Sequence, residues 1–309
     1  MLRSFKIEDI RDIPNLRHGV LLAPYSTWKI GGPARYFWEP TRELLPDVVR
    51  FCKSNGIKVW YLGRGSNVLI DSKGLDGLVI CTKRMLQSIT LNDGMISAES
   101  GLPMPTLSKF AAKLGYGGYE YLIGIPGTVG AGIAINAGLS ANGRKEIGDV
   151  LIDVELMDEQ GNIFIETKEQ LEFKYRGSNI PERRLFVVSA RFKSTYISTK
   201  EEIKSKTAEH LAARRNKQPL SKATAGSTFK RPEGGMPAGW YIDKAGLKGF
   251  TIGDAMVSKK HANWIINLGN ASSDDIIELL KYTQEIVFNK FNVTLIPEVE
   301  ILNNYKKLI

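Results

Sequence analysis

The stretch Gly124-Ile-Pro-Gly-Thr-Val-Gly-Ala-Gly-Ile-Ala-Ile-Asn-Ala-Gly138 says most about the fold of this chain. Repeated glycine and alanine around a single polar side chain, Asn136, make a poor hydrophobic core. They make a good surface for close contact with a flat or extended ligand, because glycine leaves room beside the backbone. A tightly packed sheet crossing is the structural alternative.

A second glycine-rich turn lies upstream, within Leu62-Gly-Arg-Gly-Ser-Asn-Val-Leu-Ile70, between two strand-like segments. Its successive backbone N–H groups, with the side chains of Arg64, Ser66 and Asn67, suit a phosphate group. An ordinary strand connection is the alternative. The turn is neither a Walker loop nor the dinucleotide fingerprint, because Val68 occupies the third glycine position and no helix follows. The pair of turns favours a dinucleotide held between two subdomains.

Composition indicates a globular protein with room for two or three domains: 309 residues, 43% hydrophobic and 24% charged. The N-terminal residues do not resemble a signal peptide, and no apolar run is long enough for a membrane helix. Cys52 and Cys81 fit no metal or redox spacing, which favours a reducing cytoplasm. The net charge of +9 indicates an anionic partner. A small polyanionic substrate is favoured over nucleic acid, since the basic residues concentrate beside other site-like residues and no nucleic-acid motif accompanies them.

Hydrophobic periodicity predicts an α+β fold in which strands dominate the first two thirds. The predicted strands are 35–38, 59–62, 68–70, 78–82, 88–91, 95–99, 150–157, 163–166, 185–192 and 293–302. The predicted helices are 44–54, 106–114, 199–215 and one that begins after the N-cap sequence Ser272-Ser273-Asp274-Asp275.

A series of motifs in a fixed order resembles the UDP-N-acetylenolpyruvoylglucosamine reductase (UDP-N-acetylmuramate dehydrogenase) family. The series covers nearly the whole chain. It consists of Ser26–Ala34, the two glycine turns, Tyr175-Arg176-Gly177-Ser178, Ala225–Lys230, Ala245–Gly249, Val257–Asn263 and Ile296-Pro297-Glu298-Val299-Glu300. Any one glycine turn is a weak signal, whereas the ordered series is a specific one.

The resemblance implies an FAD-binding unit of the vanillyl-alcohol-oxidase (PCMH) type in two subdomains, followed by a C-terminal α+β substrate domain. On this basis we expect FAD-binding subdomains at 1–83 and 84–196 and a substrate-binding domain at 197–309. The residues expected to contact FAD are Gly63, Arg64, Gly65, Ser66, Asn67, Val68, Gly124, Pro126, Gly127, Thr128, Gly130, Ala131, Asn136, Ala137 and Gly138. No metal is expected.

The family reaction has two halves: NADPH reduces FAD, and the flavin hydride then reduces the enolpyruvyl group of UDP-N-acetylglucosamine enolpyruvate. The matching residues are Ser227 as proton donor, with Arg176 and Glu298 stabilising the enolate. Each of these residues has a structural alternative. Arg176 suits a surface arginine, and Ser227 suits a turn or N-cap serine, with Thr228 as a rival hydroxyl. Glu298 suits an exposed strand glutamate whose side chain lies on the same face as that of Glu300.

Lys217, Lys230 and Lys248 are the candidates for the diphosphate and carboxylate of the substrate, since point cations suit phosphate. His261 is as compatible with a packed structural role as with substrate contact. Arg231 and Asp254 depart from the family pattern, which weakens the expectation for the uridine end. The short segment after Arg176 resembles the subtype without the long tyrosine-bearing lid insertion.

Two other classes of function compete with this prediction. Another FAD-dependent oxidase or dehydrogenase of the same fold, acting on a small hydroxy acid, would share the FAD turns but lack the serine and the final glutamate. A flavin- or nucleotide-sugar-binding module, or a basic nucleic-acid-binding protein, would have no use for Arg176, Ser227 and Glu298 together. The expected protein is a cytoplasmic enzyme, with a monomer favoured, no membrane contact and no nucleic-acid partner.

Overall fold

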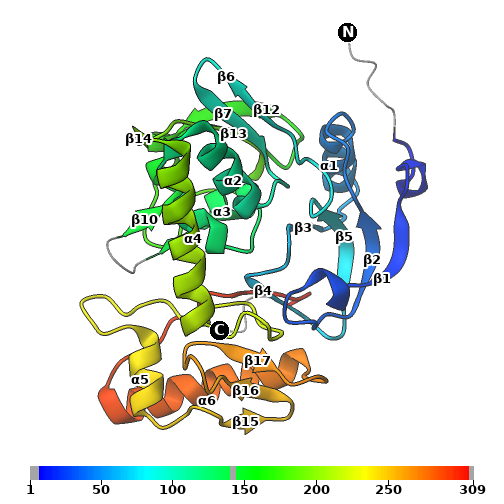
Figure 1. Ribbon diagram of the computed structural model, residues 1–309. Coiled ribbons are helices and arrows are strands. Elements are labelled where there is room, and N and C mark those ends of the chain that lie inside the picture. The colour runs from blue at the N-terminus through cyan, green and yellow to red at the C-terminus, as the bar shows by residue number, and fades with distance from the viewer. Residues whose placement is uncertain (1–6, 140–143, 306–309) are drawn as a thin grey trace. The chain divides into compact units, whose positions relative to one another are not determined.

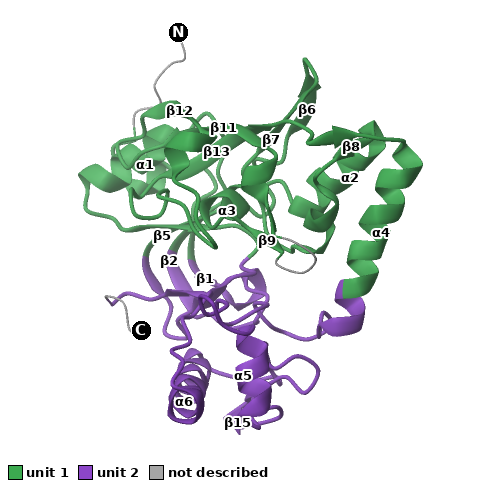
Figure 2. Cartoon of the chain, turned by 90° about the vertical axis from the view of Figure 1, so that its left-hand side faces the viewer, with its two compact units in different colours: residues 1–18, 36–64, 77–213 green, residues 19–35, 65–76, 214–309 purple. Residues whose placement is uncertain are grey.

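The structure is a computed structural model that describes residues 7–139 and 144–305. The chain divides into two compact units, coloured green and purple in Figure 2. Unit 1 comprises residues 1–18, 36–64 and 77–213, and unit 2 comprises residues 19–35, 65–76 and 214–309. The predicted division into three segments at residues 83 and 196 stays a prediction. Residues 1–6, which belong to the N-terminal segment considered for a signal peptide, and residues 140–143, which follow the second glycine run, lie outside the described residues.

The α-helices and strands are distributed along the whole chain (Figure 1). The helices are α1 Leu45–Ser54, α2 Met104–Leu114, α3 Val129–Ala134, α4 Lys200–Lys217, α5 Ala238–Lys244 and α6 Ser273–Phe291. The strands are β1 Arg17–Leu21, β2 Pro33–Trp38, β3 Val59–Leu62, β4 Val68–Ile70, β5 Leu75–Cys81, β6 Ile89–Asn92, β7 Met95–Glu99, β8 Tyr116–Gly117, β9 Gly138–Leu139, β10 Lys145–Glu146, β11 Leu151–Met157, β12 Ile163–Thr167, β13 Phe186–Phe192, β14 Tyr196–Ile197, β15 Thr251–Ile252, β16 Ala255–Val257, β17 Ile265–Asn267 and β18 Glu300–Leu302. Short 3-10 helices are Ile10–Asp12, Ala23–Tyr25, Glu120–Gly124, Ile147–Asp149 and Lys168–Leu171.

Unit 1 is built on a five-stranded sheet with the order β12-β11-β13-β7-β6. Every neighbouring pair in this sheet is antiparallel. The strands predicted at 88–91 and 95–99 are confirmed as β6 and β7, and they form a hairpin: Asn92 pairs with Met95, and Asp93 and Gly94 between them both have positive φ values, of 50° and 73°. A tight turn of this kind needs φ above zero at both central residues, which Asp and Gly tolerate well.

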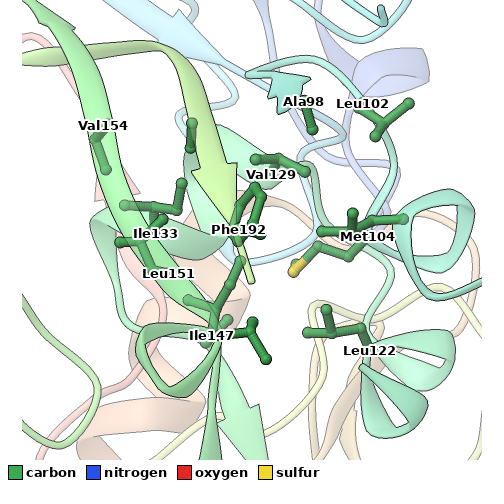
Figure 3. Close-up of a cluster of buried hydrophobic side chains, with 14 of the residues drawn as sticks. Ala98, Leu102, Met104, Leu122, Val129, Ile133, Ile147, Leu151, Val154 and Phe192 are labelled. Carbon is green, nitrogen blue, oxygen red and sulfur yellow. The ribbon is translucent and has the colours of Figure 1, made fainter. Parts of the chain in front are cut away.

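The core of unit 1 lies between this sheet and the helices α2 and α3. Helix α3 packs against β13 and β7, and it also contacts α2. Figure 3 shows the fully buried side chains that meet there, which include Met104, Val129, Ile133, Leu151 and Phe192. The short helix α3 is made of residues 129–134 of the glycine-rich stretch, so packing in this core fixes that part of the stretch.

A second core of unit 1 surrounds α1 and the parallel pair β3 and β5. Leu45, Val48, Val49 and Cys52 form the buried face of α1, as the helical spacing predicted. Strand β3 ends at Leu62, directly before the first glycine turn, so the sheet fixes the start of that turn.

Unit 2 contains the three-stranded sheet β15-β16-β17 and the helices α5 and α6. The predicted N-terminus of α6 is confirmed. The Ser272 hydroxyl accepts a hydrogen bond from the Asp275 amide, and the Asp275 carboxylate accepts one from the Ser272 amide. Ile276, Leu279 and Leu280 of α6 are fully buried in the core of the unit.

The predicted secondary structure differs from the observed one most clearly at the C-terminal end. The strand predicted over residues 293–302 is reduced to β18, Glu300–Leu302, which pairs in parallel with β4. Glu298 therefore lies before the strand, in a segment where Pro297 forms an isolated bridge with Phe229. The pattern of apolar residues suits a strand here, but the available pairing partners limit its length.

Candidate active site

The first glycine turn lies between β3 and β4, and its geometry requires glycine. Gly65 is buried and has a φ of +62°, and a Cβ added to it would lie 2.2 Å from the carbonyl oxygen of Tyr25. Among the described residues, none accepts a hydrogen bond from the backbone amides of Arg64, Gly65 or Ser66. Gly65 is buried, and buried backbone N–H groups are almost always paired, so successive amides left over in such a turn fit an anionic group such as the diphosphate of FAD.

The second glycine run combines close packing with a possible cofactor surface. A Cβ on Gly130 would lie 2.7 Å from the Cβ of Ser100, and one on Gly132 would lie 2.7 Å from the Met104 sulfur. Tight packing therefore explains these two glycines, although in a helix rather than in the sheet crossing considered from the sequence. At the other turn a Cβ on Gly63 would lie 2.6 Å from the Thr128 hydroxyl, so unit 1 brings these two predicted FAD contacts together.

Asn136, the polar residue of the run, is buried and has a φ of +46°. Its side-chain amide donates to a Glu146 carboxylate oxygen at 2.7 Å and to the Lys174 carbonyl at 3.2 Å, and its carbonyl oxygen accepts from the Gly148 amide at 3.3 Å. The side chain thus joins the glycine run to the segments around Glu146 and Lys174. Its predicted contact with FAD stays a prediction.

Arg176 lies in a tight turn, residues 174–177, and the Asn136 side-chain amide donates to the Lys174 carbonyl at the start of that turn. Lys174 and Gly177 exchange both backbone hydrogen bonds across this turn, at 3.0 and 3.1 Å, and Arg176 has the left-handed φ of +54°. Its guanidinium donates to the Gly138 carbonyl at 2.6 Å, lies 3.9 Å from the Glu146 carboxylate and 5.0 Å from the Tyr175 ring centre. The side chain is only 11% exposed. A buried, oriented arginine is a stronger candidate for binding an enolate or carboxylate than a surface one.

The segments that carry Ser227 and Glu298 are brought together in unit 2. The Glu298 amide donates to the Thr228 carbonyl at 2.8 Å, and Phe229 bridges to Pro297. The segment that follows Ser227 is thereby fixed against the segment that carries Glu298. Arg176 belongs to unit 1 and is described within that unit.

The choice between the two neighbouring hydroxyls follows from their burial. Thr228 is 1% exposed, and its hydroxyl accepts a hydrogen bond from the Ile265 amide at 3.3 Å. Ser227 is half-buried, and its hydroxyl has no hydrogen-bond partner among the described residues. It follows Gly226, where φ is +86° and an added Cβ would meet no atom within 4 Å. Ser227 is therefore the hydroxyl that remains accessible for chemistry.

The three candidate substrate lysines have different surroundings. Lys217 is the exposed last residue of α4. Lys230 is half-buried, and its backbone amide donates a hydrogen bond to the Ile296 carbonyl at 2.8 Å. The Lys248 ammonium forms a 2.7 Å ion pair with Asp243. Burial is the main cause that lowers the pKa of His261, and the cations Lys248 and Arg214 lower it further.

A basic cavity that was not anticipated from the sequence lies within unit 2. It has a volume of about 620 Å³ and is walled by two segments, around residues 215–222 and 256–266. Four of its lining residues are cationic: Arg215, Lys222, Lys259 and Lys260. Lys260 donates to the Arg215 carbonyl at 2.7 Å, which ties the two walls together. Basic residues are already clustered along the chain between Arg214 and Lys222, but their meeting with Lys259 and Lys260 is a tertiary feature.

Neither cysteine forms a disulfide. Both are buried and free, and burial raises the pKa of Cys52 to about 12 and that of Cys81 to about 11. Residues 7–139 and 144–305 contain no group of acidic, histidine or cysteine side chains arranged to hold a metal. In the same ranges no helix is both long and apolar enough to cross a membrane.

Together the fold and these residues define an FAD-binding oxidoreductase of the vanillyl-alcohol-oxidase type with a C-terminal α+β substrate-binding domain. The model of the FAD binding domain family matches residues 33–165. A second family model, described as the C-terminal domain of UDP-N-acetylenolpyruvoylglucosamine reductase, matches residues 218–302.

Relatives with the same name match almost the full length of the chain. The UDP-N-acetylenolpyruvoylglucosamine reductase of Caldicellulosiruptor saccharolyticus is 38% identical and covers 99% of this chain and 95% of its own. That of Carboxydothermus hydrogenoformans is 43% identical over 91% of this chain and 92% of its own. The crystal structure of the Thermus caldophilus reductase superposes with a TM-score of 0.77 at 36% identity, covering 92% of this chain and 98% of that one. The chain belongs to the UDP-N-acetylenolpyruvoylglucosamine reductase family.

Proposed function

We propose that this protein is the NADPH-dependent FAD enzyme that reduces UDP-N-acetylglucosamine enolpyruvate to UDP-N-acetylmuramate, a step in peptidoglycan precursor synthesis. The observation that carries the proposal is the accessible Ser227, held beside the Glu298 segment in a domain that matches this family. A hydroxy-acid oxidase of the same fold would need neither residue.

The first glycine turn supports the binding of FAD. The amides of Arg64, Gly65 and Ser66 are the candidates for the diphosphate, and the further contacts proposed are those of the second glycine run. When bound, FAD would supply the redox chemistry, which is the transfer of a hydride equivalent from NADPH to the enolpyruvyl double bond. The turn itself binds and orients, because its amides carry no proton that leaves at neutral pH.

Ser227 is the proposed proton donor to the carbon that becomes carbanion-like when the hydride is added. A hydroxyl is a weak acid, so it can protonate only a strongly basic carbon placed next to it. The absence of a competing hydrogen bond among the described residues leaves the Ser227 proton available for that transfer. Arg176 and Glu298 are the proposed partners of the enolate: the arginine offers a planar fork of donors to its carboxylate, and Glu298 would donate a hydrogen bond in its protonated form.

The anionic part of the substrate is proposed to bind cations of the C-terminal region. Lys217, Lys230 and Lys248 are the candidates taken from the sequence, and the basic cavity adds Lys222, Lys259 and Lys260. Lys217 lies between two lining residues of that cavity, Arg215 and Gln218, along the chain. Lys248 would exchange its ion pair with Asp243 for the substrate.

The remaining parts of the proposal concern domains, partners and location. We propose FAD-binding subdomains at 1–83 and 84–196, a substrate domain at 197–309, and action as a cytoplasmic monomer. NADPH is proposed as the reductant on the strength of family membership alone. A comparison of NADPH with NADH in single-turnover reduction of the flavin tests that part by itself.

The purified protein itself provides the decisive experiment. We expect a yellow protein whose flavin absorbance is bleached by NADPH and restored by UDP-N-acetylglucosamine enolpyruvate, with UDP-N-acetylmuramate as product. A flavoprotein that is reoxidised by oxygen alone and ignores the enolpyruvyl substrate would contradict the proposal and favour an oxidase. A chain that does not bind FAD would end it.

Ser227→Ala separates the two half-reactions. We expect NADPH to bleach the flavin at the wild-type rate, whereas reoxidation by the enolpyruvyl substrate slows by about 10³-fold, the scale of a lost proton donor. The matched control is Thr228→Val, which removes the buried neighbouring hydroxyl and should leave the rate of reoxidation per folded molecule within a few-fold of wild type. If Ser227→Ala reoxidises normally, Ser227 is not the donor.

A further inference from the structure

Segments of unit 2 that are far apart in the sequence form a closed ring of hydrogen bonds. The ring runs through the turn at Thr27, the first glycine turn at residues 65–67, the segment before Glu300 and the loop at 224–228 that carries Ser227. All of these residues belong to the same unit. The following inference rests on the function proposed above and concerns the residue that closes the ring.

Thr27 donates two hydrogen bonds to the first glycine turn, and both go to the same carbonyl oxygen. Its backbone amide donates to the Gly65 carbonyl at 2.9 Å, and its hydroxyl donates to the same oxygen at 3.1 Å. A peptide unit is planar and trans, so its C=O and the following N–H point in opposite directions. Fixing the Gly65 carbonyl therefore also fixes the direction of the Ser66 amide, which makes no hydrogen bond to another described residue.

The same threonine also holds the loop of Ser227. Its carbonyl accepts a hydrogen bond from the Thr224 amide at 3.1 Å. Thr224 in turn donates through its hydroxyl to the Ile265 carbonyl at 2.7 Å and accepts from the Gly226 amide at 3.3 Å. Trp28, fully buried beside Thr27, donates to the same Ile265 carbonyl at 2.9 Å. The turn at 27–28 and the loop at 224–226 are thus tied to one strand, β17.

The other half of the ring passes through Asn67 and Glu298. The Asn67 side-chain amide donates to the Glu298 carbonyl at 3.1 Å, and the Glu298 amide donates to the Thr228 carbonyl at 2.8 Å. The Glu300 amide donates to the Asn67 carbonyl at 3.0 Å, as part of the β4–β18 pairing. The Asn67 link in this half, like the link from the Thr27 hydroxyl in the other half, runs from a side chain to a backbone carbonyl.

We propose that Thr27 is a positioning residue of the reaction. Its hydroxyl fixes the Gly65–Ser66 peptide, which aims the Ser66 amide at the FAD diphosphate and keeps the glycine turn in register with the Ser227 loop. The threonine side chain would contact neither FAD nor substrate. It would act through the first glycine turn, proposed to bind FAD, and through the loop at 224–228, which carries the proposed proton donor Ser227.

The test replaces the hydroxyl without changing the shape of the side chain. Thr27→Val keeps the backbone amide and the branched side chain but removes one donor to Gly65. We expect the Kd of the apo-protein for FAD, measured by flavin fluorescence titration, to rise about tenfold, which corresponds to about 1.4 kcal/mol. We also expect kcat for the enolpyruvyl substrate to fall about tenfold while its KM stays within about twofold, and Thr27→Ser to restore both.

The control is Thr283→Val on α6. Thr283 is buried in the same unit, and its hydroxyl donates to the Leu279 carbonyl at 2.7 Å, so its replacement removes a bond of the same kind outside the ring. We expect this variant to lower the melting temperature but to leave kcat and the Kd for FAD per folded molecule unchanged. Thr27→Ala, which cannot overfill the site, takes the place of Thr27→Val if the latter does not fold.

A double-mutant cycle with Ser227→Ala checks the route of the effect. If Thr27 acts by placing the Ser227 loop, Thr27→Val should slow flavin reoxidation much less when Ser227 is already absent. Thr27→Val with kcat and the Kd for FAD both within twofold of wild type would overturn the proposal, as would full additivity in the cycle. The titration with FAD is informative even if the wild-type protein fails to reduce the enolpyruvyl substrate, so failure of the proposed function is distinguishable from failure of this one.

Discussion

At the scale of single residues, the backbone of Arg176 is the most telling feature. A left-handed φ of +54° is uncommon for a side chain other than glycine or asparagine, and here it is held by the Lys174–Gly177 backbone pair and the Asn136 amide. Strain of this kind persists where the surroundings over-determine it, often at functional sites. An asparagine or glycine would relieve it, so the retention of arginine points to a use for the guanidinium.

Arg176→Lys tests that use. Lysine keeps the positive charge but loses the planar fork of donors, including the one bonded to the Gly138 carbonyl. We expect the reduction of the enolpyruvyl substrate to slow by about 10²-fold, the scale of one lost donor to a developing oxyanion. Flavin reduction by NADPH should change by less than threefold. Stopped-flow absorbance of the two half-reactions measures both, and equal slowing of the two would argue for a structural role instead.

His261 makes a prediction about pH. Burial and the nearby cations Lys248 and Arg214 lower its pKa in the folded protein, so the unfolded chain binds this proton more readily. The contribution of His261 to the free energy of unfolding is therefore fully present above the unfolded pKa of about 6.5. It is lost as the pH falls below that value, at no more than about 1.4 kcal/mol per pH unit.

The corresponding measurement is urea unfolding at pH 7.5 and 5.5. We expect His261→Gln to lose less stability between these two values than wild type does. Burial lowers the pKa of His210 as well, so part of the pH dependence should remain in the variant. Identical losses in wild type and variant would show that His261 does not titrate differently on folding.

At the scale of elements, glycines in two loops of unit 2 serve different purposes. Gly65 and Gly226 both have positive φ values, but a Cβ on Gly65 would lie 2.2 Å from a backbone oxygen, whereas one on Gly226 would meet nothing within 4 Å. Glycine is therefore required at position 65 both for the left-handed backbone and because a side chain would clash, and at position 226 for the left-handed backbone alone.

This difference predicts unequal effects of the same substitution. Gly226→Ala should cost about 1 kcal/mol, the usual penalty of a left-handed alanine. Gly65→Ala must also displace the Tyr25 carbonyl, so we expect a loss of at least about 3 kcal/mol together with the loss of FAD binding. Thermal melting of the apo-proteins and FAD titration measure these effects. Comparable melting temperatures for the two variants would mean that the turn at Gly65 relaxes easily.

At the scale of the whole molecule, the net charge is +9, and part of this positive charge is concentrated around the basic cavity of unit 2. Four cationic side chains line that cavity and no acidic side chain does. A site of one sign attracts anionic molecules over a distance that salt shortens to about 10 Å at 0.1 M.

We therefore expect the KM for the enolpyruvyl substrate to rise several-fold between 50 and 500 mM NaCl, with a smaller change in kcat. The double substitution Lys259→Gln and Lys260→Gln should raise KM at low salt and flatten this dependence. Lys281→Gln on the exposed side of α6 is the control, because Lys281 does not line the cavity. A salt dependence that is the same in all three proteins would show that the anionic group binds elsewhere.

The sequence by itself determined the types and places of most elements and the family of the protein. Strands β3 and β4 and the helices α1 and α6 follow from hydrophobic spacing and, for α6, from its N-cap, while the polar helix α4 fits the basic residues in its last turn. These signals are local and need no knowledge of the fold. The ordered motifs identified the family because the whole series in one order is far more specific than any single glycine turn.

Only the tertiary structure decided how the candidate residues are used. It buries Thr228 and leaves Ser227 accessible, shortens the last strand to Glu300–Leu302, and engages the Asn136 amide within the protein. It also brings residues 215–222 and 256–266 together around one cavity and closes the ring through Thr27. These outcomes depend on hydrogen bonds and packing between segments far apart in the chain, and such pairings leave no periodic signal in the sequence.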